Sequence, residues 1–146
     1  MADSASVGGG AHPAPHRHWA RRAELGFANL APLLAWSLHL VINYAFASWS
    51  CYPDRTPRTS PLLSGLWTLL VAVDAASLVI SAVATLVAYR IWQATAEEMQ
   101  DTRSPLGETG EGRTRFLAIW GVLIGSGFFL AVLFDFVGLW IVPICG

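Results

Sequence analysis

The residues of this sequence that are best suited to do chemistry are four polar side chains inside long apolar runs: His39, Asn43, Asp74 and Asp135. Ionisable groups in the apolar core of a bilayer are costly, so they usually face the protein interior and often mark function. A histidine with two carboxylates can relay protons or bind a cation. The same groups can instead hold helices together by hydrogen bonds. The sequence leaves both interpretations of this polar cluster open.

The three ionisable residues are predicted to lie at a similar depth. His39 and Asp135 lie twelve and ten positions before Cys51 and Cys145, and Asp74 lies twelve positions after the start of its own run. With a helical rise of about 1.5 Å per residue, these separations correspond to roughly 18, 15 and 18 Å. We therefore expect them to meet in the middle or outer half of the bilayer.

Three apolar runs are long enough to cross a membrane as helices. They cover about Leu25–Trp49, Leu62–Trp92 and Phe116–Ile144, and each exceeds the roughly 20 residues that a spanning helix needs. Hydrophobic residues make up 54% of the chain and charged residues 13%, whereas a soluble domain carries about 25% charged residues. The sequence predicts an all-α membrane protein whose single domain, residues 19–146, contains three transmembrane helices.

Small and polar residues recur at helical spacing within these runs. Ser77 and Ser81 share a face with Asp74, and Gly121 and Gly125 form a GxxxG pair in the third run. Small residues let helix backbones approach closely, and hydroxyl groups can hydrogen-bond across the contact. We expect these four small residues to mediate helix packing in a three-helix bundle around the polar cluster.

The arginines predict how the chain is oriented in the membrane. Seven arginines lie in the N-terminal segment and around the second loop, and two lie in the first loop. Because cytoplasmic loops carry an excess of basic residues, we expect a cytoplasmic N-terminus and a C-terminus on the periplasmic or outer side. The acidic, glycine-rich loop of about residues 97–112 is then cytoplasmic. Residues 1–18 are predicted to form a disordered tail because they are rich in Gly, Ala, Pro and Ser.

The two cysteines are predicted to form a disulfide. In this orientation Cys51 closes the first span on the outer side and Cys145 follows the third span on the same side, and the chain has no other thiol. Compartments outside the cytoplasm are oxidising. A Cys51–Cys145 bond would join the first span to the third, and the alternative is a pair of free thiols.

Several classes of function lack support in the sequence. Walker, Rossmann, HExxH and GxSxG patterns do not occur, and a net charge of −1 gives no reason to expect a nucleic-acid partner. A haem held between helices usually takes two axial ligands, but His39 is the only histidine in the apolar runs. We therefore expect no catalytic residue, no metal ligand and no cofactor-binding residue.

Two parts of the chain carry a family resemblance: AWSLHLVINYA at 35–45 with SWSC at 48–51, and PICG at 143–146. With them the chain resembles, over its three spans, a group of small three-span bacterial membrane proteins of unassigned function. Such proteins tend to be encoded beside subunits and assembly factors of caa3-type haem–copper oxidases. The resemblance implies a non-catalytic accessory or assembly subunit of a respiratory complex in the bacterial inner membrane, with lipid and other subunits as its partners.

Two further interpretations compete with this one. The first is a small proton-coupled transporter or channel, acting as a homo-oligomer, in which Asp74 or Asp135 carries the proton. The second is a membrane redox enzyme that uses the two cysteines as a dithiol. The absence of a CxxC pattern favours a structural disulfide over this redox role.

Overall fold

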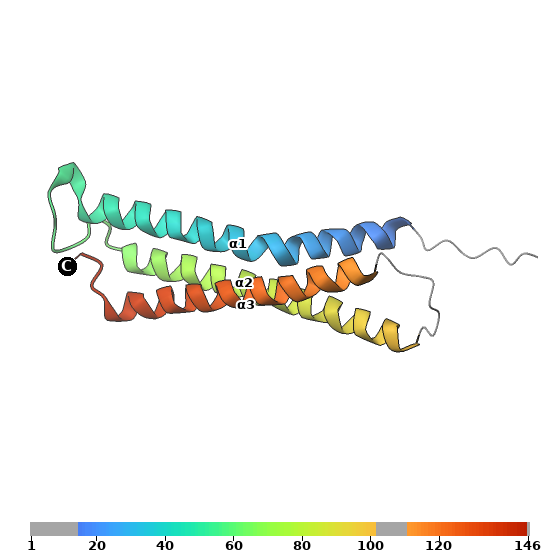
Figure 1. The fold of residues 1–146 in the computed structure, drawn as a ribbon. Helices are drawn as coiled ribbons and strands as arrows, with labels where there is room; N and C mark the ends of the chain where they lie inside the picture. The colour runs from blue at the N-terminus through green and yellow to red at the C-terminus, as the bar shows by residue number, and fades with distance from the viewer. Residues whose placement is uncertain (1–14, 102–110, 146) are drawn as a thin grey trace, which may run out of the picture.

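The computed structural model describes residues 15–101 and 111–145, and this part of the chain is all-helical (Figure 1). Helix α1 covers Pro15–Cys51, helix α2 covers Leu66–Asp101 and helix α3 covers Glu111–Ile141, with a short 3-10 turn, η1, at Pro53–Arg55. The three helices lie side by side, and the α1–α2 loop and the end of α3 lie at the same end of the bundle. This end is called the disulfide end below.

Each helix contains a segment that is long and apolar enough to cross a membrane. The segments are Arg22–Cys51, Leu66–Thr95 and Arg113–Ile141. At about 1.5 Å per residue, 30 residues extend about 45 Å, which exceeds the roughly 30 Å hydrocarbon core. In a membrane, helices of this length would tilt or reach into the head-group region. The predicted all-α class, with three helices long and apolar enough to span a membrane, is confirmed.

At the end opposite the disulfide, the helices are longer than the predicted spans. Helix α1 begins at Pro15, so the last residues of the predicted disordered tail are helical, and residues 1–14 lie outside the described part. Helix α2 continues to Asp101. Of the predicted loop 97–112, residues 102–110 also lie outside the described part.

At the disulfide end, α2 begins at Leu66, later than the predicted start near Leu62. The backbone N–H groups of Leu62 and Leu63 donate to the carbonyl and hydroxyl oxygens of Ser50, each at 3.2 Å. Ser50 is fully buried at the end of α1. These bonds hold the loop against α1, so the chain becomes helical only after it has turned away from Ser50.

Helix α3 ends at Ile141, three residues before the predicted end of the span at Ile144. Pro143 has no backbone N–H and cannot continue the helical hydrogen-bond ladder. The last described residues leave the helix axis and bring Cys145 to Cys51, where a disulfide joins them with Cα atoms 5.5 Å apart. The structure thus places the predicted Cys51–Cys145 pair at disulfide distance.

The core of the bundle is a stripe of buried residues along α2. Their spacing of three or four residues keeps them on one face of the helix. Most of them are small, which lets α1 and α3 approach α2 closely. The stripe consists of Leu66, Leu70, Asp74, Ser77, Ser81, Ala84, Ala88, Ile91 and Thr95.

The two glycines of the GxxxG pair lie where α3 crosses α2. A Cβ atom at Gly121 would lie 2.9 Å from the Cβ atom of Ala88, and one at Gly125 would overlap the hydroxyl group of Thr85. A Cβ atom at Gly127, on the opposite face of α3, would meet no described atom within 4 Å. The α2–α3 contact therefore depends on the absence of a side chain at Gly121 and Gly125.

Candidate functional site

The structure brings the four polar residues of the apolar runs into one cluster. His39 and Asn43 come from α1, Asp74 from α2 and Asp135 from α3. The Nε2 atom of His39 lies 3.3 Å from Oδ1 of Asp74 and 3.6 Å from Oδ2 of Asp135. The amide of Asn43 donates to Oδ1 of Asp74 at 2.6 Å. A single polar cluster thus connects all three helices.

Helical spacing explains how these side chains meet. His39 and Asn43 are four residues apart and therefore share a face of α1, and Asp135 lies one turn after the buried Val132 on α3. His39 is 1% exposed and Asp74 is 0% exposed, whereas the Asp135 side chain is 46% exposed. Two members of the cluster are sealed inside the bundle, and the third reaches its surface.

The hydrogen bond of the His39 ring assigns one of its protons. Its Nδ1 atom lies 3.1 Å from the carbonyl oxygen of Trp36. A carbonyl oxygen only accepts hydrogen bonds, so Nδ1 carries the proton of this contact. In the neutral ring Nε2 then presents a lone pair to Asp74 and Asp135. A favourable contact requires one more proton, either on Nε2 or on one of the two carboxyl groups.

The cluster has more hydrogen-bond acceptors than donors. Three buried atoms in it have no hydrogen-bond partner among the described residues: Nε2 of His39, Oδ1 of Asn43 and Oδ2 of Asp74. A buried polar atom without a partner costs roughly 1–3 kcal/mol. Each of these atoms is an acceptor or can act as one. The cluster therefore suits a ligand that donates hydrogen bonds.

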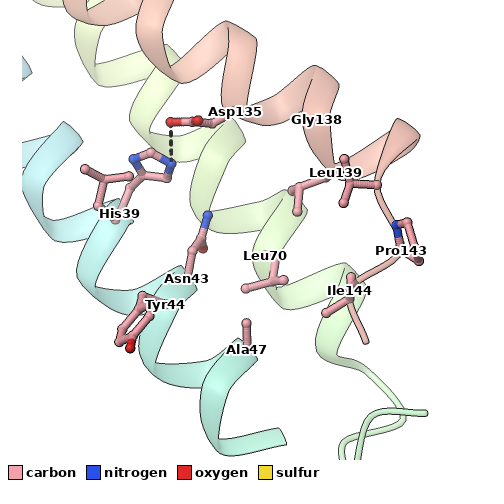
Figure 2. A pocket seen from close by; sticks show the side chains of 12 residues that line it. His39, Asn43, Tyr44, Ala47, Leu70, Asp135, Gly138, Leu139, Pro143 and Ile144 are labelled. Atoms are coloured by element: carbon pink, nitrogen blue, oxygen red, sulfur yellow. Dashed lines mark ion pairs between the residues drawn. The ribbon is translucent and has the colours of Figure 1, made fainter. Parts of the chain in front are cut away.

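A groove of about 380 Å³ leads along α1 and α3 to this cluster (Figure 2). His39, Asn43 and Asp135 line one end of it, with the dashed ion pair between His39 and Asp135. The remainder of the lining is mostly apolar and includes Leu70 and Leu139. Polar groups at one end of an apolar groove can orient a long side chain or a small amphiphilic molecule.

The predicted packing serines lie on the buried stripe of α2. The hydroxyl of Ser77 lies 3.4 Å from the carbonyl oxygen of Ala35 and contributes a weak bond between α2 and α1. Ser81 is fully buried, and its hydroxyl has no partner among the described residues. The small size of Ser81, more than its hydroxyl, therefore serves the helix contact.

Sequence reasoning did not single out Asn29, which links α1 to α3. Its amide donates to the carbonyl oxygens of Leu25 at 2.8 Å and Leu117 at 3.3 Å. Asn29 lies two heptads before Asn43, on the same face of α1. This regular spacing could have identified it. The groove, by contrast, had no signal in the sequence.

Within the described residues, no group of three or more His, Cys, Asp and Glu side chains is arranged to hold a metal ion. Comparisons of the chain with protein-family models, curated proteins and solved structures found no match.

Proposed function

We propose that this protein is a non-catalytic subunit of a larger membrane complex. The observation that carries the proposal is the position of Asp135, which is 46% exposed on α3, within a membrane-spanning segment. An aspartate at the centre of a spanning helix costs about 2.5–3.5 kcal/mol on insertion scales, and Asp135, which lies six residues before the end of its segment at Ile141, carries a smaller part of this cost. A partner subunit that covers Asp135 and donates a hydrogen bond to it removes much of this cost.

The surface around Asp135 also supports contact with another membrane protein. The neighbouring Phe134 is 76% exposed and Val137 is 45% exposed. In the most apolar 18-residue stretch of each segment, taken in chain order, only 28%, 28% and 22% of the residues are buried within the bundle. The three helices therefore leave most of their surface for lipid and for a partner, and a polar group within an apolar surface gives a partner a specific point of attachment.

The resemblance of residues 35–51 and 143–146 to three-span proteins encoded beside oxidase genes supports a haem–copper terminal oxidase as the complex. The protein would act there as an accessory or assembly subunit in the bacterial inner membrane. The distribution of arginines supports a cytoplasmic N-terminus. A disulfide at the end where Cys51 and Cys145 meet supports an outer location for that end, since disulfides persist in oxidising compartments.

Purification of the tagged protein at its native expression level tests this function. The membrane is solubilised in mild detergent, and the proteins that copurify are identified and quantified. We expect oxidase subunits in stoichiometric amounts, and none with a tagged multi-pass protein of similar size from the same membrane. Recovery of the chain alone, or only with copies of itself, would contradict the proposal.

A second candidate function is a proton-coupled transporter or channel formed by several copies of the chain. The observation that favours it is the contact of His39 with two carboxyl groups at the end of a groove. If it is correct, replacing both Asp74 and Asp135 with Asn abolishes a pH-dependent flux in proteoliposomes. An unchanged flux would eliminate this function.

A further inference from the structure

The shortage of hydrogen-bond donors at the groove defines the chemistry of its occupant. We propose that the groove receives an arginine or lysine side chain from a transmembrane helix of a different chain, and that the cationic group lies between Asp135 and His39. This inference rests on the proposed function, because it names the chemistry of the partner that a membrane subunit would contact.

The negative charge of the cluster favours binding of a cation. The one additional proton that the His39 contact requires, on Nε2 or on one of the two carboxyl groups, still leaves a net charge of −1 on the cluster. One N–H of the Asn43 amide donates to Asp74, and Nδ1 of His39 donates to a backbone carbonyl. A basic side chain supplies charge and donors together, because guanidinium and ammonium groups donate hydrogen bonds and accept none.

The shape of the surface gives such a side chain access. Asp135 is half-exposed at the end of the groove. Gly138, one turn further along α3, also lines the groove, and a Cβ atom there would meet no described atom within 4 Å. A small residue on a helix surface lets a partner backbone come close. The methylene groups of an arginine or lysine can then follow the apolar wall while the charged end reaches Asp135.

The sequence argues that the occupant belongs to a different chain. This chain contains no lysine. The arginine nearest to Asp135 along α3 is Arg115, twenty residues away, which is about 30 Å along a helix. In a parallel second copy, the described arginines lie in the loop beyond Cys51 or toward the opposite end of the bundle, and none of them lies within a helix at the depth of Asp135. The arginines of the described part are Arg17, Arg21, Arg22, Arg55, Arg58, Arg90, Arg113 and Arg115.

Photo-crosslinking in the native membrane tests the inference. A photoreactive residue replaces Leu139, which lines the groove, in the full-length chain at native expression. A matched variant carries it at Val79, which is 62% exposed on α2 and does not line the groove. We expect Leu139 to crosslink to a transmembrane peptide of another protein that contains an arginine or lysine, and we expect the Val79 variant not to yield that peptide.

The possible outcomes separate this inference from the proposed function. A crosslink from Leu139 to a helix without a basic residue overturns the inference and leaves the subunit role standing. Crosslinks only to lipid or to a second copy of this chain also overturn the inference. If the purified protein additionally comes without other proteins, the proposed function fails as well.

A pair of variants provides a second test once the partner is known. Asp135→Leu should lower recovery of the partner at least about tenfold, because it leaves the partner's charge without a counterion. Replacing the partner's basic residue with leucine as well should restore recovery, since neither side then holds an unpaired charge. Yield and disulfide formation establish that Asp135→Leu folds. Unchanged recovery of the partner with a folded Asp135→Leu variant would overturn the inference.

Discussion

His39 and Asp74 face each other inside the bundle, with Nε2 of His39 3.3 Å from Oδ1 of Asp74. Both side chains are fully buried. Because Nδ1 of His39 is committed to the carbonyl oxygen of Trp36, this contact is favourable only with an additional proton. The hydrogen bond from Asn43 to Asp74, at 2.6 Å, needs no such additional proton.

We predict that Asn43 and Asp74 are energetically coupled. In a double-mutant cycle with Asn43→Ala and Asp74→Ala, the coupling energy should fall at about 0.6–1.7 kcal/mol, the range from average to largest for hydrogen bonds between membrane helices. Reversible unfolding in mixed micelles measures it. A cycle of Asp74 with the distant Thr95 is the control and should give none. Additive effects of Asn43→Ala and Asp74→Ala would show that the bond contributes nothing to stability.

The glycines of α3 offer a matched pair of substitutions. Gly125→Ala should destabilise the bundle by about 1–3 kcal/mol, because its methyl group overlaps the Thr85 hydroxyl and overpacked contacts carry costs of this size. Gly127→Ala adds the same methyl group in open space and should change stability by less than about 1 kcal/mol. Thr85→Ala should recover part of the loss in Gly125→Ala. Equal effects of the two alanines would contradict this packing.

The spans and the membership of the cluster could be predicted because both depend on properties of a single helix. Run length identifies a spanning helix, and residue spacing fixes which side chains share its face. Similar distances of His39, Asp74 and Asp135 from the ends of their runs predicted a similar depth for them. Three helices of similar length that pack side by side then bring those residues together.

The groove and the exposure of Asp135 could not be predicted, because they depend on how α1 and α3 pack against each other. The spacing that places Asp135 beside His39 does not determine which part of its side chain is covered. The helix ends at Leu66 and Ile141 differed from prediction because hydropathy ignores local backbone partners. Ser50 holds the loop before α2, and Pro143 ends the α3 hydrogen-bond ladder.

The disulfide should contribute to stability through the long chain segment that it closes. Cys51 and Cys145 are 94 residues apart in sequence. A closed loop of about 100 residues corresponds to about 4.7 kcal/mol in the chain-entropy model, whereas disulfides typically deliver about 2–4 kcal/mol. We expect Cys145→Ser to lower the free energy of unfolding by no more than this, because inserted helices restrict the unfolded state. Thiol alkylation of the unreduced protein checks the bond itself. Labelling of both cysteines without prior reduction would contradict it.

Reporter fusions test the proposed orientation. Alkaline phosphatase is active only outside the cytoplasm because it needs disulfides. We expect activity when it follows residue 146 and none when it follows residue 106, and a cytoplasmic fluorescent reporter should show the opposite pattern. Activity at residue 106 without activity at residue 146 would reverse the orientation.

The size of the native particle tests most directly whether this protein is a subunit. Membranes with the protein at native expression are solubilised in mild detergent, separated by native electrophoresis and probed for the chain. We predict that it migrates with a complex far larger than a few copies of itself, and that Asp135→Leu releases it to a smaller size. Migration of the unaltered protein as a single chain or a small oligomer of itself would contradict the proposed function.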